Sequence, residues 1–224
     1  MNAHAAASTS PSLKKLFKRL TGQAPDDAAP RDAESSYFST LFQERSEDGV
    51  LQSTWAARSA EVHAQPCDRK RGAALFCKLW GEDRHFAALS ADDLARLADY
   101  MEYTQVPANQ EVIGQNEQGD YLVVVLEGSL AVDRVQAWGG RARLAEAHAG
   151  DMLGEMSLLD AGARFSACTT LTPTTLAVID ARRLDEMMSR HPRLALALLA
   201  SLSRRLSLRL RQVSARLSAL LSRS

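Results

Sequence analysis

The spacing of apolar residues changes twice along the chain. After Ser90, apolar residues recur at helical intervals as far as Met101, with two aspartates in the first turn. Helical spacing returns at 181–190 and again after Pro192, which suits a first-turn position. Between these helical stretches lie short β-type runs bounded by glycines, at 112–113, 121–126, 130–135, 144–148, 167–171 and 176–179. Because such runs are typical of a small barrel or sandwich, the pattern predicts an α+β fold with helices flanking a strand-rich domain.

Four segments follow from this pattern. Residues 1–36 are rich in Ala, Ser, Pro and Asp and are predicted to form a mobile N-terminal segment. Residues 37–81 are predicted to be a helical extension, and 82–191 the strand-rich domain. Residues 192–224 are predicted to form a long, basic C-terminal helix.

Within the first segment, residues 13–20 place leucines and Phe17 on one helical face, with lysines and an arginine opposite. They predict a short solvated helix, or one that docks on a membrane surface or a protein partner. No apolar run approaches the ~20 residues needed to cross a bilayer, and no signal peptide is recognisable. We therefore expect a cytoplasmic protein without a transmembrane segment.

Nothing breaks a helix between Pro192 and about Leu221. At 1.5 Å per residue such a helix is about 45 Å long, which is more than one compact domain can cover. Its apolar residues follow a heptad seam, formed by Leu206, Leu210, Val213, Leu217 and Leu220. We expect a homodimer through 199–221, and the alternative is an antiparallel fold-back onto residues 37–80 of the same chain.

Charge is balanced in total, with 27 basic and 27 acidic residues, but residues 193–224 hold seven arginines and no acid. These arginines predict a solvated basic face, a flank of the helical seam or a docking surface for an acidic protein. Contacts with DNA phosphates would be nonspecific, so sequence-specific DNA binding is not expected.

Reactive side chains form no recognisable catalytic or metal-binding set. Cys67, Cys77 and Cys168 are too few and too scattered for a disulfide framework, so we expect buried or half-buried free thiols. The five histidines lack metal-ligand spacing, and there is no nucleophile elbow, P-loop or HExxH motif. The sequence thus predicts neither an enzyme nor a bound cofactor.

The residues that carry chemistry lie at 150–168. A glycine at Gly154 lets the backbone approach a ligand, and the next residues can form one helical turn whose first amides are free donors. A short loop then returns the chain at Arg164, whose planar guanidinium can bind a phosphate through two hydrogen bonds. Glu155 cannot favour a phosphate, so we expect it to accept from a sugar hydroxyl, with Arg164 as a further candidate partner. This set matches a cyclic phosphodiester beside a free ribose 2′-hydroxyl.

At this point the chain resembles the cyclic-nucleotide-binding domain family, of the catabolite-activator type. The family pattern G-D-x-[FL]-G-E-[LM]-[AS]-L-[LI]…R-x-[AST]-[AS] is met by Gly150, Asp151, Leu153, Gly154, Glu155, Met156, Ser157, Leu158, Leu159, Arg164 and Ser166. The resemblance covers about 82–210. It implies a jelly-roll-like, eight-stranded β-roll at 82–191, flanked by helices, with the long C-terminal helix closing over the ligand and forming the dimer seam.

The resemblance implies a cyclic nucleotide as ligand, with cAMP as the first candidate and cGMP or another as alternatives. The implied binding residues are Gly154, Glu155, Met156, Ser157, Arg164, Phe165 and Ser166. Three features depart from the family. Ala163 replaces a common proline, and Phe165 stands where many members have Ser, Thr or Ala. Arg209 and Leu210 occupy the positions of the Thr-Ser pair that meets adenine in cAMP-activated transcription factors. Cyclic nucleotide binding is therefore better supported than cAMP specificity.

We expect a regulatory sensor that acts on an unidentified protein partner. Regulators of the catabolite-activator type continue past the long helix into a DNA-binding domain, and this sequence stops at Ser224. The sequence alone therefore predicts a sensor without a DNA-binding domain of its own. The alternative is a ligand-independent interaction module that uses the β-roll as a scaffold and the basic C-terminal helix as its docking surface. A third hypothesis is a regulator tethered through residues 13–20.

Overall fold

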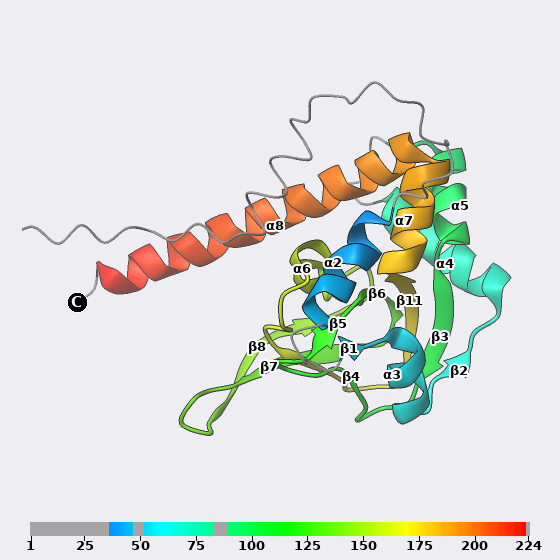
Figure 1. Cartoon of the computed structure of the whole chain (residues 1–224). Helices are drawn as coiled ribbons and strands as arrows, with labels where there is room; N and C mark the ends of the chain where they lie inside the picture. Colours follow the sequence, from blue (N-terminus) through cyan, green and yellow to red (C-terminus); the bar gives the residue numbers. More distant parts are fainter. Residues whose placement is uncertain (1–35, 47–51, 83–88, 223–224) are drawn as a thin grey trace, which may run out of the picture. The chain divides into compact units, whose positions relative to one another are not determined.

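A computed structural model describes residues 36–46, 52–82 and 89–222 (Figure 1). The helix expected at 13–20 lies outside these residues. The helices are α2 (Tyr37–Ser46), α3 (Trp55–Glu61), α4 (Arg69–Gly81), α5 (Ala91–Asp99), α6 (Glu155–Asp160), α7 (Ala181–Arg190) and α8 (Pro192–Leu221). The strands are β1 (Gln52–Ser53), β2 (Gln65–Pro66), β3 (Glu102–Val106), β4 (Glu111–Ile113), β5 (Gln118–Gly119), β6 (Tyr121–Glu127), β7 (Leu130–Val135), β8 (Arg141–Ala147), β9 (Met152–Leu153), β10 (Ala167–Thr170) and β11 (Thr174–Asp180).

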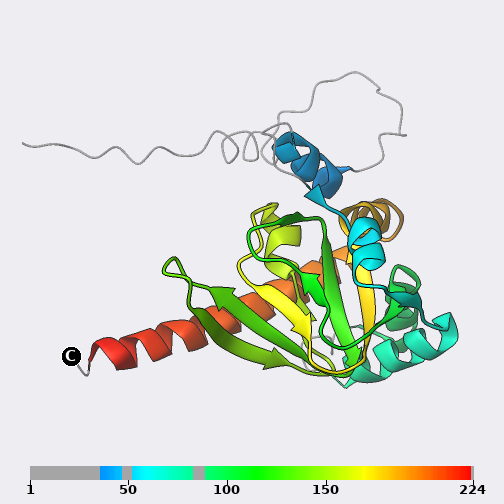
Figure 2. The same cartoon turned by 90° about the horizontal axis from the view of Figure 1, so that it is seen from below.

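The strands from β3 onward form mainly two antiparallel sheets (Figure 2). One sheet has the order β4-β10-β7-β8, and the other has the order β2-β3-β11-β6-β9. The predicted α+β class, with a jelly-roll-like β-roll, flanking helices and a long C-terminal helix, is confirmed. The eight strands expected for the roll correspond to nine segments, β3 to β11, of which β5 and β9 are only two residues long.

Strand β6 separates two hydrophobic cores. Leu122 and Val124 face a core that they share with residues of α4 and α7. Val123 and Val125 face a second core inside the roll, together with Tyr121. Successive side chains of a strand point to opposite faces, so a strand buried on both faces reads as a continuous apolar run. Because β6 packs against both cores, Tyr121 at its start is held in a fixed position, and the surrounding loops can pack against it.

Hydrogen bonds at their first turns fix where two helices begin. Ser90 Oγ accepts from the Asp93 amide at 3.1 Å, and Asp93 Oδ2 accepts from the Ser90 amide at 3.2 Å, which forms a capping box before α5. Asp180 Oδ1 accepts from the Arg183 amide at 2.7 Å at the start of α7. Both helices were predicted from apolar spacing, and both are confirmed.

A buried aspartate joins α2 to α7. Asp185 of α7 accepts from the amides of Phe38 and Ser39, each at 2.8 Å, and thereby satisfies two free donors at the start of α2. Within 37–81 the chain also includes the two-residue strands β1 and β2, and β2 pairs with β3.

Strand β3 was missed by the sequence reading. Its residues Glu102 and Gln105 are polar and exposed, so no continuous apolar run marks the strand. Tyr103 and Val106 are nevertheless buried, and β3 pairs along its length with β11. The strand forms because it pairs with β11, which is distant in the sequence, and a local pattern of apolar residues cannot reveal such pairing.

Helix α8 is buried only in its first third. Leu198 and Leu202 pack in the helix-covered core, whereas the heptad seam from Leu210 to Leu220 is exposed in the single chain. The described residues of the 37–80 segment do not cover this seam, so the fold-back alternative is absent from that part of the chain. Figure 1 shows α8 beginning beside α7 and passing α6 before it extends further.

Candidate functional site

The short helix α6 begins at a glycine in the left-handed region of backbone space. Gly154 has φ +88°, which L side chains rarely adopt. A Cβ at this position would also lie 2.5 Å from Nη1 of Arg164. The predicted tight glycine is therefore required both by the backbone turn and by the side chain that packs against it.

The backbone of Arg164 is fixed to the segment before β5. Its amide donates to the Glu117 carbonyl at 2.7 Å, and its carbonyl accepts from the Asn116 amide at 2.9 Å. Glu117 is in turn paired with Arg58 of α3. The chain thus returns from α6 to a segment that a second ion pair holds in place.

The guanidinium of Arg164 is buried, with only 3% of the residue exposed. Nη1 donates to the Gly154 carbonyl at 2.8 Å, and Nη2 donates to the Tyr121 carbonyl at 2.5 Å. Its central carbon lies 4.7 Å from the centre of the Tyr121 ring. A Cβ at Gly119 would lie 2.5 Å from Nη2, so the guanidinium fills the space between Gly119 and Gly154.

Arg164 is a buried cation whose guanidinium donates to two neutral carbonyls. Within the described residues no carboxylate lies at ion-pair distance from it. Burial lowers the pKa of Arg164, although the nearby negative groups oppose that shift. Since buried charges in proteins are normally paired, this position favours an anion.

Asp120 adds a second unusual group beside Arg164. Burial, and to a lesser extent the charge of Asp180, raise the pKa of its carboxyl, Arg164 lowers it in part, and the net result is a pKa of about 6. Its Oδ1 is buried without a hydrogen-bond partner. Asp120 is therefore a poor permanent counterion for the guanidinium below pH 6.

Glu155 binds the long C-terminal helix. Its Oε1 accepts from Nη1 of Arg209 at 2.8 Å, with 7% of the glutamate side chain exposed and 57% of the arginine side chain. One turn earlier on α8, Arg205 donates to the Gly150 carbonyl at 3.4 Å. The helix therefore contacts the loop on both sides of Gly154.

This arrangement corrects one hypothesis from the sequence. Arg164 had been a candidate partner of Glu155, but the glutamate pairs with Arg209, while Arg164 donates to the carbonyls of Gly154 and Tyr121. The sequence reading had noted Arg209 only as a departure from a family pattern. Its contact joins residues 54 positions apart, and no local signal reveals it.

The other predicted site residues differ in exposure. Ser157 is buried and Ser166 is half-buried, whereas Met156 and Phe165 are largely exposed. The Phe165 ring lies 4.0 Å from the guanidinium carbon of Arg134, which also donates to the Phe165 carbonyl. Arg134 of β7 is a neighbour of the site that the sequence reading missed.

All three cysteines are free thiols, as expected, and burial raises the pKa of Cys168 to about 12. In the described ranges no group of three or more His, Cys, Asp or Glu side chains could hold a metal ion. None of the helices seen there is long and apolar enough to cross a membrane.

Comparison with protein families identifies the domain that carries this site. The family model for the cyclic nucleotide-binding domain matches residues 103–191. A CRP-like cAMP-activated global transcriptional regulator of Mycobacterium tuberculosis is 28% identical over 121 residues, 54% of each chain. A cAMP-dependent protein kinase regulatory subunit of Mycosarcoma maydis is 30% identical over 90 residues, 40% of this chain and 17% of that one. The chain thus spans about half the length of the first relatives it matches.

Two solved structures resemble this chain over more than half of its length. A cyclic nucleotide-binding domain from Methylobacillus flagellatus has a TM-score of 0.62 at 25% identity, covering 68% of this chain and 85% of that one. The catabolite activator protein of Thermus thermophilus has a TM-score of 0.54 at 27% identity, covering 62% of this chain and 63% of that one.

The raised pKa of Asp120 predicts a pH-dependent difference in stability between the wild type and Asp120→Asn. In the unfolded chain an aspartate releases its proton near pH 4, whereas in the folded protein Asp120 keeps it to about pH 6. As pH rises through this window, ionisation favours the unfolded state, so the wild type loses stability. Denaturant unfolding should show Asp120→Asn to be more stable above pH 6.5 by an amount on the order of 2 kcal/mol.

At pH 4 the carboxyl is largely neutral in both states, so the advantage of Asp120→Asn should be smallest there. This end of the titration serves as the internal control. A difference in unfolding free energy that stays constant between pH 4 and 7.5 would show that Asp120 is not buried in the way described.

Proposed function

Residues 103–191 belong to the cyclic nucleotide-binding domain family, and from this premise we propose that the chain is a regulatory protein that binds a cyclic nucleotide at 150–168. The observation that carries the proposal is the buried guanidinium of Arg164, which lies between Gly119 and Gly154 and, within the described part of the chain, donates to two carbonyls and to no carboxylate. A guanidinium has five N–H donors, so donors remain for a phosphate. Two of the relatives are a transcriptional regulator and a kinase regulatory subunit, and we assign a regulatory rather than a catalytic role.

The polar groups around Arg164 suit a cyclic phosphodiester with its ribose. The ligand phosphate carries one negative charge, which Arg164 balances. Glu155 uses Oε1 for Arg209, and its second oxygen is available to accept from the ribose 2′-hydroxyl. We assign supporting contacts to the remaining predicted residues, Gly154, Met156, Ser157, Phe165 and Ser166.

The relatives differ in the cyclic nucleotide for which they are named. A CRP-like regulator and a kinase regulatory subunit are named for cAMP, and a Caenorhabditis elegans relative is a cGMP-dependent protein kinase, 35% identical over 92 residues. We take cAMP as the first candidate. Arg209 is engaged with Glu155 and Leu210 is exposed, so neither offers the hydroxyl pair expected for adenine, and cGMP stays a candidate.

A ligand-independent interaction module is the second candidate function. It is favoured by the hydrogen bonds of Arg164 to Gly154 and Tyr121, because an arginine that already links two loops can serve as a structural strut. In that case the exposed basic face of α8 would be the functional surface. The two functions differ in whether the site binds nucleotide.

We propose that ligand binding is transmitted through the Glu155–Arg209 ion pair. Glu155 starts α6 inside the site, and Arg209 lies on α8 just where the helix leaves the buried core. The loop at 150–168 can either contact α8 or be released from it. A ligand with different affinities for these two arrangements would shift the position of the helix. The output of the sensor would then be the exposed part of α8.

We also propose that a second copy of the chain covers the heptad seam of α8. Leu210, Val213, Leu217 and Leu220 are exposed at alternating intervals of three and four residues, which is the pattern of a two-helix heptad seam. An apolar stripe of this length is rarely left in water.

Calorimetry tests the proposed ligand directly. Wild-type protein should bind cAMP or cGMP, and Arg164→Ala should weaken binding by about 1.5–3 kcal/mol, the range for a charge-assisted hydrogen bond. A second variant, Gly119→Ala, keeps the arginine but places a Cβ 2.5 Å from Nη2, so it should displace the guanidinium and weaken binding as well.

Arg71→Ala, which removes a surface arginine paired with Glu127, is the matched control and should bind as the wild type does. Thermal unfolding of each variant separates loss of binding from loss of fold. If folded wild-type protein gives no binding heat with cAMP, cGMP or cyclic dinucleotides, the sensor function is contradicted and the interaction module is favoured.

Hydrogen exchange tests the transmission step. Saturating ligand should change amide protection in the 202–215 part of α8 in the wild type. In Arg209→Ala the ligand should still bind, while this change in α8 is largely lost, because the ion pair between the helix and Glu155 is missing.

Arg211→Ala is the control, since it removes the same charge from an exposed position two residues away. A ligand-dependent change in α8 that survives in Arg209→Ala would exclude the ion pair as the route.

Sedimentation equilibrium tests the proposed dimer. The wild type should have twice the chain mass of 24.5 kDa. The double variant Leu210→Glu with Leu217→Glu should be monomeric, because two carboxylates would be buried in the seam. Gln212→Glu with Ala215→Glu adds the same charge off the seam and should stay dimeric. A monomeric wild type at high micromolar concentration would contradict the dimer.

A further inference from the structure

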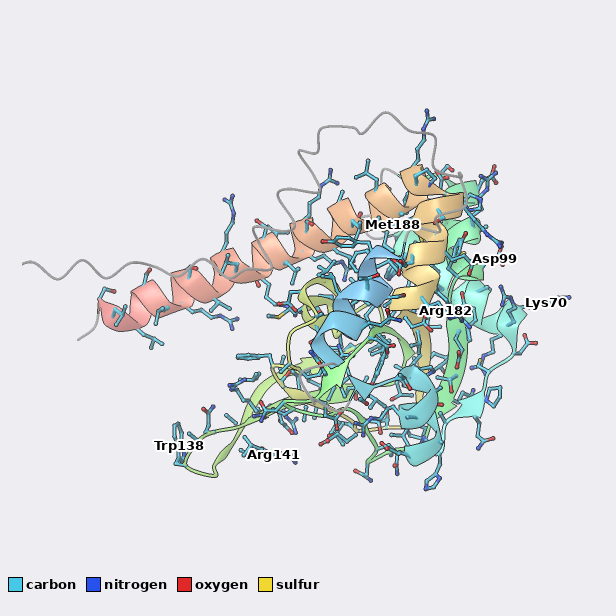
Figure 3. The ribbon with its side chains drawn as sticks, viewed as in Figure 1. Lys70, Asp99, Trp138, Arg141, Arg182 and Met188 are labelled. Carbon is cyan, nitrogen blue, oxygen red and sulfur yellow. The ribbon has the colours of Figure 1, made fainter. Side chains whose placement is uncertain are left out.

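A second concave site lies on the α4–α5–α7 side of the domain. The cleft has a volume of about 430 Å³, and none of the 150–168 residues contributes to it. Its lining is polar and comprises Arg69, Arg96, Asp99, Tyr100, Arg182, Arg183, Glu186, Arg190 and His191. Figure 3 shows two of these side chains, Asp99 of α5 and Arg182 of α7, on the same side of the domain and far from Trp138 at the tip of the β7–β8 hairpin.

Five arginines from three helices meet at this cleft, and three of them have acidic partners. Arg69 pairs with Asp99 at 3.1 Å, Arg190 with Glu186 at 3.2 Å and Arg183 with Glu102 at 3.5 Å. Each of these pairs includes at least one side chain that is well exposed. Such pairs contribute little to stability, so an incoming anion can exchange for the carboxylates at small cost.

The other two arginines carry the excess charge. Arg96 of α5 and Arg182 of α7 are exposed, and among the residues that the structure describes neither forms an ion pair at contact distance, although the charge of Arg96 acts on the nearby Asp93. They come from two different helices, and both side chains line the same cleft. Two guanidinium groups in one cleft favour a ligand with more than one phosphate, because each can bind one phosphate through two hydrogen bonds.

A polar aromatic pair adjoins the arginines. Tyr100 Oη and His191 Nδ1 are 2.9 Å apart, and the two rings meet edge to face with centroids 6.0 Å apart. His191 also stands at the junction of α7 and α8. The cleft therefore joins a cationic surface to half-buried rings at the point where the long helix begins.

We propose that this cleft binds a polyphosphate group, with Arg96 and Arg182 as its principal ligands. The volume exceeds that of a single inorganic phosphate and falls in the range of small-molecule sites, which is about 300–1,000 Å³. The phosphates can come from an inorganic polyphosphate or from a nucleoside triphosphate, whose base would reach Tyr100 and His191. The site is separate from the proposed cyclic nucleotide site, and it does not depend on that function.

Calorimetry at physiological salt tests this site with two probes, tripolyphosphate and ATP. The wild type should bind tripolyphosphate, and the double variant Arg96→Ala with Arg182→Ala should weaken binding at least about tenfold. The matched control, Arg211→Ala with Arg216→Ala, removes two exposed arginines from α8 and should change affinity less than about twofold. Equal affinities for the two probes would show that the cleft recognises the phosphates alone. Tighter binding of ATP would show that the nucleoside also contacts Tyr100 and His191.

Cyclic nucleotide binding measured on the same samples keeps the two sites apart, because both double variants should retain it if the 150–168 site works as proposed. Three results would overturn the cleft proposal. They are no binding of either probe to the wild type at millimolar concentration, equal weakening in the two double variants, or unchanged tripolyphosphate affinity in Arg96→Ala with Arg182→Ala.

Discussion

Arg164 is the residue on which the geometry of the site depends. Its guanidinium links the carbonyl before α6 to the carbonyl at the start of β6, and its size requires glycine at both 119 and 154. A buried cation held by two carbonyls costs free energy unless an anion completes its surroundings. The same side chain thus serves the fold and favours a phosphate ligand, which explains why a tight loop, two glycines and an arginine occur together.

The surrounding architecture makes this site rigid on one side and movable on the other. Strand β6 is anchored by a core on each face, so Tyr121 is a fixed support for Arg164. Beyond its buried first third, helix α8 reaches the opposite side of the loop through the polar contacts of Arg205 and Arg209, and it is exposed after them. A few polar contacts are easier to rearrange than a packed core. This contrast supports the proposal that ligand binding is transmitted through α8.

Local chemistry was readable from the sequence, but long-range contacts were not. Apolar spacing located α5, α7 and α8, and glycine-bounded runs located most strands of the roll. The residue types at 150–168 identified Gly154, Glu155 and Arg164. Strand β3 was missed because pairing with β11 defines it. The partner of Glu155 was missed because Arg209 arrives from a helix 54 residues away, at a distance that only packing of the whole domain can set. The arginine cleft brings together α4, α5 and α7 for the same reason.

The central claim is that Arg164 itself binds the ligand phosphate, and side-chain NMR of the arginine Nε–H groups observes this directly. The Arg164 resonance can be assigned from its loss in Arg164→Lys. The account predicts that a 3′,5′-cyclic nucleotide shifts this resonance, while the matching 5′-monophosphate at equal concentration leaves it largely in place. An Arg164 resonance that stays unchanged when the site is saturated with cyclic nucleotide would contradict the account.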